Sequence, residues 1–252
     1  MDFSNQIVLI TGASRGIGRA CARQFAEKGA RVAVHYNSNE AAADETLASL
    51  AGSGHMKVQA DLAEPAAVQS MVETVIAHMG GLHVLVNNAG VYEDHSPTKV
   101  SYDEWNTSWM YTLQTNLMGA ANAAYCAARH MMQHGGGRIV NVSSRGAFRG
   151  EPDSPAYGAS KAGMNSMGQS LAKALAPHGI YVTTVAPGWV ETDMAADYLA
   201  GKGGGDIRAQ SPLNRVASPD EIAYTVLFLA SEGAEFVTGA VVDVNGASYL
   251  RT

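Results

Sequence analysis

The sequence predicts an α/β fold: a single domain over residues 1–252, built on one doubly wound parallel sheet of about seven strands with helices on both faces. Short apolar runs rich in Val and Ile alternate with longer amphipathic segments along the whole chain, as in buried parallel strands joined by helices. No linker long or polar enough to divide the chain interrupts this alternation. The length of 252 residues is also sufficient for one large α/β core.

Seven apolar runs are the expected strands, and they are bounded by Gly, Asp, Asn or Pro. These runs are Ile7–Ile10, Arg31–Tyr36, Met56–Ala60, Leu82–Val86, Arg138–Val142, Tyr181–Ala186 and Ala240–Val244. Six helices are expected between them, over residues 15–28, 39–51, 64–79, 103–134, 156–178 and 218–231. The last helix has the clearest start, because Ser218 can cap it and Pro219 follows at the first helical position. Strict alternation implies right-handed βαβ units in one sheet.

The composition excludes several classes of protein. The formal charge of −6, from 17 Lys+Arg and 23 Asp+Glu, gives no electrostatic reason to expect nucleic acid or an anionic membrane as partner. No apolar run approaches the ~18 residues of a membrane span, and the first residues lack the basic start of a signal peptide. Two cysteines, Cys21 and Cys126, cannot form a disulfide framework. We therefore expect a cytoplasmic protein.

A glycine-rich turn follows the first expected strand and opens the first helix. Its glycines are Gly12, Gly16 and Gly18 in the run Thr11-Gly12-Ala13-Ser14-Arg15-Gly16-Ile17-Gly18. Gly12 permits the tight turn, Gly16 lets the backbone approach a pyrophosphate, and Gly18 allows close packing of helix on strand. The free N–H groups of the helix start then face the phosphates. This position predicts a dinucleotide site on a Rossmann-type sheet, with a tight turn that binds nothing as the alternative.

From this motif onward the sequence resembles the short-chain dehydrogenase/reductase family, whose glycine motif has the form T-G-x-x-x-G-x-G. Further family landmarks occur in family order over roughly residues 6–247. They are Asn87-Asn88-Ala89-Gly90, Asn116, Ser143-Ser144, Tyr157-Gly158-Ala159-Ser160-Lys161 and Pro187-Gly188 with Thr192. The resemblance implies an oxidoreductase that transfers a hydride between a nicotinamide cofactor and a carbonyl compound or secondary alcohol. Within the family, the sequence is most similar to 3-oxoacyl carrier-protein reductases and bacterial sugar or polyol dehydrogenases.

The end of the second expected strand favours NADP(H) over NAD(H). In dinucleotide folds an acid about 20 residues past the glycines binds the ribose hydroxyls and selects NAD. Tyr36 occupies that position here, and the first carboxylate after it is Glu40. Arg15, with Asn37 and Ser38, is suited to bind the 2′-phosphate through charge-assisted hydrogen bonds. An Arg15 that is merely solvated is the alternative.

Tyr157 and Lys161 are four residues apart, which places them on one face of a helix. Ser144 precedes Tyr157 by 13 residues and ends an expected strand, at the edge where a parallel sheet binds ligands. Reduction of a carbonyl builds negative charge on its oxygen, which Tyr157 would neutralise as general acid. A nearby ammonium on Lys161 would lower the phenol pKa towards a range where proton transfer works in both directions. Ser143 is a competitor for the serine role, although the family pattern favours Ser144.

By resemblance, Ser144 orients the carbonyl, Lys161 also binds the nicotinamide ribose, and Asn116 holds a water that links Lys161 to solvent. The remaining cofactor contacts that the resemblance implies are Ser14, Ile17, Asp61, Leu62, Asn88, Ala89, Gly90, Pro187, Gly188, Val190 and Thr192. Asp61 would contact the adenine or cap the helix at residue 64, and both roles can coexist. Val190 and Thr192 would bond the nicotinamide carboxamide.

Residues 188–217 form the one irregular region, and they contain the glycine run 201–205. Such a run inside an enzyme is more often a mobile lid than a boundary, so we expect a lid over the substrate. No metal site is expected: His130 and His134 have a suitable spacing, but no carboxylate or thiol nearby completes a ligand set. The Ala-rich stretch 120–128 indicates a packed helix face, and the resemblance implies a homo-oligomer, either dimer or tetramer.

The expected substrate is a small carbonyl or alcohol compound in a pocket lined by Tyr92, the Arg145–Glu151 loop, Trp189 and the lid beyond Thr192. Carrier-protein reductases tend to offer basic residues beside this mouth. His134-Gly135-Gly136 and Pro177-His178 stand there instead, which weakens the carrier-protein interpretation. A non-catalytic cofactor-sensing protein on the same fold is the alternative function, although a sensor need not keep the four catalytic residue types. An epimerase or dehydratase would need a larger carboxy-terminal region.

Overall fold

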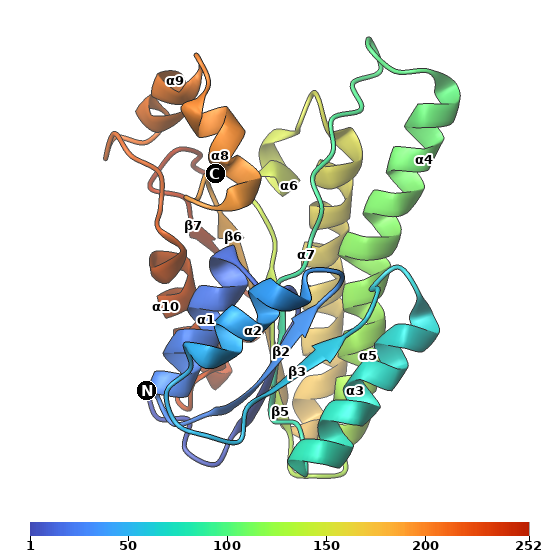
Figure 1. Cartoon of the computed structure of the whole chain (residues 1–252), viewed down its shortest axis with the longest axis vertical. Coiled ribbons are helices and arrows are strands. Elements are labelled where there is room, and N and C mark those ends of the chain that lie inside the picture. The colour runs from blue at the N-terminus through green and yellow to red at the C-terminus, as the bar shows by residue number, and fades with distance from the viewer. Residues whose placement is uncertain (252) are drawn as a thin grey trace.

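A seven-stranded parallel sheet lies at the centre of the structure, a computed structural model that describes residues 1–251 (Figure 1). The strand order is β3-β2-β1-β4-β5-β6-β7. The strands are β1 (Ile7–Ile10), β2 (Arg31–Tyr36), β3 (Met56–Gln59), β4 (Val84–Asn87), β5 (Gly137–Val142), β6 (Ile180–Pro187) and β7 (Val241–Val244). Each predicted strand is present within two residues of its expected bounds. The predicted fold class is therefore confirmed.

Helices cover both faces of the sheet (Figure 1). One face carries α1 (Gly16–Glu27), α2 (Glu40–Ala48) and α10 (Pro219–Ala230), and the other carries α3 (Pro65–Met79), α5 (Gly119–Met131) and α7 (Pro155–Leu175). Alternate residues of β1 belong to opposite layers: Val8 and Ile10 are buried with α1 and α10, while Ile7 and Leu9 are buried with α3 and α5. This alternation is the period-two geometry of a strand buried on both faces.

The long helix expected over residues 103–134 is wrong as one element. The chain forms α4 (Tyr102–Leu113), a π-helical segment η1 (Gln114–Met118) and then α5. The wider π turn contains Asn116, whose amide bonds to both backbone groups of Val91 in the loop after β4. Such insertions in a helix occur mostly at functional sites. The departure from a regular helix thus places one predicted catalytic residue.

Residues 188–217 are more regular than expected, because they contain α8 (Asp193–Ala200) and α9 (Gly204–Ala209). Both helices lie beyond the carboxyl ends of the central strands (Figure 1). The remaining short elements are α6 (Gly146–Arg149), η2 (Ala176–His178) and η3 (Glu235–Val237). Ser218 caps α10 as expected, in a capping box with Glu221. Across residues 1–251, no helix combines the length and apolarity that crossing a bilayer requires.

Candidate active site

A cavity of about 610 Å³ lies at the carboxyl ends of β1, β2, β4, β5 and β6, beside the point where the strand order reverses between β1 and β4. Open α/β sheets bind ligands at this position. All the residues predicted to contact cofactor line the cavity except Gly18. Those lining it are Gly12, Ser14, Arg15, Gly16, Ile17, Tyr36, Asn37, Ser38, Asp61, Leu62, Asn88, Ala89, Gly90, Tyr157, Lys161, Pro187, Gly188, Val190 and Thr192.

The glycine turn requires its glycines for different reasons. Gly12 has a φ of 63°, and a Cβ there would stand 2.9 Å from the Ala89 Cα. Gly18 lies behind the turn, where a Cβ would overlap the Gly12 carbonyl oxygen and come within 2.6 Å of the Asn88 Nδ2. That amide donates to the carbonyl oxygens of Thr11 and Gly12. Asn88 thus links the end of β4 to the glycine turn, so its side chain stabilises the position of the turn.

His35 supports the same turn, and sequence reasoning missed it. It is buried in β2, where its Nδ1 accepts the Gly12 N–H at 2.9 Å. Its Nε2 lies 3.1 Å from the Ala60 carbonyl oxygen and must donate to it, because a carbonyl has no proton. The ring is therefore the neutral Nε2–H tautomer, and burial lowers the pKa of His35 to about 4. No sequence motif marks a histidine at this position.

Stability should depend on this neutral ring. The folded-state pKa of about 4 lies below the ordinary value of 6.5, so the unfolded chain binds the proton more readily. The contribution of His35 is complete above pH 6.5 and is lost as the pH falls towards 4, by at most about 3 kcal/mol. In His35→Gln, an amide can still accept from Gly12 and donate to Ala60, so we expect the free energy of unfolding to fall less on acidification. Urea unfolding between pH 7 and pH 4 measures that free energy, with exposed His78→Gln as control. An equal pH dependence in the unchanged protein and both variants would contradict the prediction.

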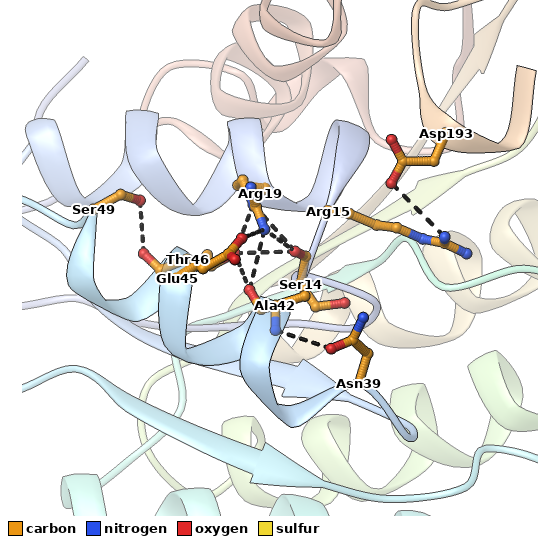
Figure 2. Close-up of polar contacts among 9 residues, drawn as sticks. All are labelled: Ser14, Arg15, Arg19, Asn39, Ala42, Glu45, Thr46, Ser49 and Asp193. Atoms are coloured by element: carbon orange, nitrogen blue, oxygen red, sulfur yellow. Dashed lines mark hydrogen bonds and ion pairs between the residues drawn. The ribbon is translucent and has the colours of Figure 1, made fainter. Parts of the chain in front are cut away.

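The end of the cavity beside the glycine turn contains a cation, Arg15. No carboxylate stands at the end of β2, the position of the acid that selects NAD in dinucleotide folds. Arg15 extends into solvent and forms an ion pair with Asp193 at 3.7 Å, with 63% and 70% of the two side chains exposed (Figure 2). Tyr36 stands at the end of β2. Burial raises the pKa of its phenol, and the nearby Glu40 carboxylate raises that pKa further. Asn37 and Ser38 follow it along the same wall. The Arg15 guanidinium is thus accessible to an incoming anion.

Arg19 holds the turn against α2, as Figure 2 shows. Its guanidinium donates to the Ser14 carbonyl oxygen at 2.7 and 3.1 Å, and to the Thr46 hydroxyl at 2.9 Å. Asn39 caps α2 through the Ala42 N–H.

The sequence analysis allowed Asp61 to cap the helix at residue 64, and that expectation is wrong. Asp61 accepts the N–H of Ala63, while Glu64 occupies the N-cap position of α3. Asp61 nevertheless lines the cavity, so its predicted adenine contact stays a prediction.

Ser144, Tyr157 and Lys161 come together at the other end of the cavity. Tyr157 and Lys161 lie in the first two turns of α7, and Ser144 lies just beyond the end of β5. The Lys161 Nζ donates to the Val142 carbonyl oxygen at 2.9 Å and lies 5.7 Å from the centre of the Tyr157 ring. Burial lowers the pKa of Lys161 to about 8. The structure therefore brings together the three residues that the sequence analysis grouped.

The expected direction of the Tyr157 pKa is wrong. Burial raises the pKa of Tyr157 to about 12, against a lowering contribution from the Ser144 hydrogen bond and a further raising contribution from Glu151. The partial desolvation of a phenol that lines the cavity outweighs any benefit from the Lys161 ammonium, which is directed to the Val142 carbonyl. In this arrangement the Tyr157 phenol is protonated at neutral pH.

Asn116 is fully buried behind the catalytic cluster and does not line the cavity. Its Oδ1 accepts the Val91 N–H at 2.8 Å, and its Nδ2 donates to the Val91 carbonyl oxygen and the Ser160 hydroxyl. Gly90 lies between Asn116 and Lys161: a Cβ there would be 3.4 Å from both the Asn116 Oδ1 and the Lys161 Nζ. The two side chains thus face one small space.

The substrate side of the cavity contains the residues that the sequence predicted there, together with several that it missed. Tyr92, Arg145, Glu151 and Trp189 were expected. Tyr111, Thr115, Met194 and Tyr198 also line the wall. Tyr111 comes from the end of α4, and Thr115 comes from η1. Met194 and Tyr198 come from α8, which the sequence did not predict.

His130 and His134 stack with ring centroids 4.0 Å apart, and the His130 Nε2 accepts the N–H of Leu82. His130 therefore joins α5 to the loop before β4. Over the described part of the chain, no group of three or more His, Cys, Asp or Glu side chains is arranged to hold a metal ion.

Comparisons with known proteins give a consistent result. A family model described as enoyl-(acyl carrier protein) reductase matches residues 12–247. The 3-oxoacyl-[acyl-carrier-protein] reductase FabG of Staphylococcus aureus is 38% identical over 244 residues, 96% of this chain and 97% of that protein. FabG of Escherichia coli is 36% identical over 250 residues, 99% of this chain and 100% of that protein. A solved mutant of a Serratia marcescens short-chain dehydrogenase/reductase superposes with a TM-score of 0.90 at 31% identity, covering 98% of this chain and 99% of that one.

Proposed function

Because this chain belongs to the short-chain dehydrogenase/reductase family, we propose that it transfers a hydride between NADP(H) and a carbonyl or secondary alcohol, with Tyr157 as general acid and base. The observation that carries this proposal is the meeting of Ser144, Tyr157 and Lys161 in the same cavity as the glycine turn. A sensor would need the glycine turn, but not a phenol with a lysine and a serine beside it in the same cavity. The family's oxidoreductase chemistry requires both.

The residues present suit a dinucleotide. Gly12 packs so closely on Ala89 that only a glycine fits, and the N–H groups at the start of α1 are free to meet phosphate. When bound, the nicotinamide supplies or accepts the hydride. Its ribose would be held by Lys161 and its carboxamide by Val190 and Thr192. All three of these residues line the cavity.

The proton is handled by the chain itself. In the reducing direction the Ser144 hydroxyl orients the substrate carbonyl, and the Tyr157 hydroxyl donates its proton to the oxygen as negative charge develops there. The Lys161 ammonium then stabilises the phenolate. Reprotonation would pass through the space that Lys161 and Asn116 share beside Gly90. A water there would accept from Lys161 and donate to the Asn116 Oδ1.

Absorbance of the reduced nicotinamide tests the proposal. Carbonyl compounds are screened with NADPH and NADH, and alcohols with the oxidised forms. We expect turnover that follows NADPH in preference to NADH. Tight binding of cofactor, without turnover on any member of a broad panel, would favour the sensor instead.

Arg15 should set the preference for NADP(H). A guanidinium bonded to the 2′-phosphate contributes about 1.5–3 kcal/mol, so Arg15→Ala is expected to weaken NADPH binding by tenfold or more. NADH has no phosphate there, and its affinity should change less than about twofold. Fluorescence titration of both cofactors measures the ratio, at two salt concentrations because the contact is exposed.

Arg23→Ala is the matched control, since Arg23 is an exposed arginine on α1 that does not line the cavity. Parallel losses of NADPH and NADH affinity in Arg15→Ala would contradict a phosphate contact. They would instead indicate that Arg15 only shapes the glycine turn.

We also propose a mobile lid, a homo-oligomer and a cytoplasmic location. Residues 188–217 contribute Trp189, Met194 and Tyr198 to the cavity wall, so their movement would open it.

Exposed Met110, Met118 and Tyr125 on α4, η1 and α5 provide apolar surface for a second copy of the chain. Light scattering tests the assembly into a dimer or tetramer.

A further inference from the structure

Three aromatic side chains form a continuous wall beside the catalytic phenol. Tyr92 follows β4, Trp189 follows β6, and Tyr198 lies in α8. The Tyr92 ring meets the Tyr157 ring edge-on at 4.9 Å and the Tyr198 ring at 6.1 Å, while Trp189 lies 5.6 Å from Tyr198. Aromatic faces carry negative potential and attract polarised C–H bonds. The wall thus offers an apolar surface of inclined aromatic rings close to the Tyr157 ring.

A carboxylate faces the same space. Glu151 lines the cavity, with 13% of its side chain exposed. It lies against Gly146, where a Cβ would stand 2.5 Å from its Oε1, so the glycine leaves the room that this carboxylate occupies. Glu151 contributes to the raised pKa values of both Tyr157 and Tyr92, as expected for a negative charge close to both rings.

This carboxylate keeps capacity to accept hydrogen bonds. Arg149 balances its charge through loose contacts, 3.4 Å from Nε to Oε1 and 3.5 Å from Nη2 to Oε2. Arg145 instead donates to Gln210 at 2.5 Å and to Ser248 at 2.6 Å. The pair of Glu151 and Arg149 is neutral overall, so the site favours a neutral donor over an ammonium group.

We propose that the substrate is a neutral polyhydroxylated compound of the sugar or polyol class, held by Glu151 and the aromatic wall. This inference rests on the proposed function. C–H faces of the substrate pack on Tyr92, Trp189 and Tyr198, and a hydroxyl remote from the reacting carbon donates to the Glu151 carboxylate. An aliphatic acyl chain would bury that carboxylate with only the loose contacts of Arg149 to satisfy it, which is costly. A keto acid would place a second negative charge beside it.

The chemistry balances as a two-electron oxidation of one secondary alcohol. Tyr157 first releases its own proton to solvent, the phenolate oxygen then takes the hydroxyl proton, and the reacting carbon loses its hydride to the oxidised dinucleotide. The alcohol becomes a ketone, and the dinucleotide is reduced. Glu151 takes no part in the electron transfer; it selects the substrate through a hydroxyl that does not react.

A comparison of Glu151→Gln with the unchanged protein tests the assignment. The probes are myo-inositol and D-sorbitol as polyols, cyclohexanol as a ring with a single hydroxyl, and acetoacetyl thioester in the reducing direction. We expect kcat/KM to be higher for a polyol than for cyclohexanol. Glu151→Gln should lower it about 10- to 100-fold for the polyol, as for loss of a hydrogen bond to a charged acceptor, and less than about twofold for cyclohexanol. Asp153→Asn, which removes an exposed partner of Lys99, is the control.

Two results would overturn the inference while leaving the proposed function intact. One is preferred turnover of the thioester with no effect of Glu151→Gln. The other is an equal loss on polyol and cyclohexanol, which would indicate that Glu151 only supports the loop. Absence of turnover on alcohols, ketones and thioesters with either nicotinamide would instead reject the proposed function, and the inference with it.

Discussion

The Tyr157→Phe variant should lose about 10²- to 10⁴-fold in kcat, the usual contribution of a positioned general acid or base. The substitution removes one oxygen from a ring that lines the cavity and leaves its contact with Tyr92 in place. The pKa of about 12 keeps the phenol protonated at neutral pH, so the native side chain is ready to donate to a developing alkoxide. Phenylalanine has no proton to give. Measured kcat, with NADPH affinity from fluorescence titration, checks the expectation.

Cofactor affinity should be nearly unchanged in this variant, because Lys161 and the glycine turn are retained. Tyr224→Phe is a matched control: Tyr224 is an exposed tyrosine on α10, away from the cavity, and its kcat should match the native value. Near-native turnover in Tyr157→Phe would exclude Tyr157 as the proton donor. Loss of turnover together with cofactor affinity would indicate a disturbed fold rather than a missing proton.

The sequence was sufficient for the parts of the site that depend on short spacing. Gly12, Gly16 and Gly18 fall within one turn, and Tyr157 and Lys161 share one helix face. Ser144 needed the rule that the carboxyl ends of parallel strands meet at one edge, and the family resemblance to favour it over Ser143. Local periodicity, strand polarity and the resemblance together therefore indicated the cavity and the three residues that meet at one end of it.

Features that depend on tertiary packing could not be predicted in this way. The π segment at 114–118 follows from the bonds between Asn116 and the loop after β4, and no residue pattern marks it. His35 supports the turn from a neighbouring strand, 23 residues away. Tyr198 reaches the cavity from α8, a helix in a segment that composition alone indicated as irregular. Long-range contacts decide each of these positions.

The Tyr157 pKa shows the same division. The spacing indicated correctly that an ammonium lies near the phenol, and charge alone would then lower its pKa. The degree of burial, which a spacing does not reveal, acts in the opposite direction and is larger. Lys161 is also directed to the Val142 carbonyl. The structure was therefore needed to decide which of these opposing effects on the Tyr157 pKa is larger, even though the residues involved were known from the sequence.

Gly18→Ala should disable the dinucleotide site although Gly18 itself does not line the cavity. A Cβ at residue 18 overlaps the Gly12 carbonyl oxygen and approaches Asn88 and the Ala13 Cα. These neighbours are backbone atoms, or an amide already bonded to the turn, so none can move alone. Overpacking of this kind costs about 1–3 kcal/mol, and the displaced turn would no longer present its N–H groups to phosphate. We expect dinucleotide affinity to fall at least about tenfold, since tenfold corresponds to 1.4 kcal/mol.

Denaturant unfolding and cofactor titration measure the two effects together. Gly205→Ala is the matched control, because a Cβ there meets nothing within 4 Å and alanine favours the helix α9 in which it lies. Its stability and affinity should not fall. If Gly18→Ala kept native stability and native affinity, the turn would have to tolerate a shift. Close packing between the glycine turn and α1 would then not be what positions the backbone N–H groups that bind phosphate.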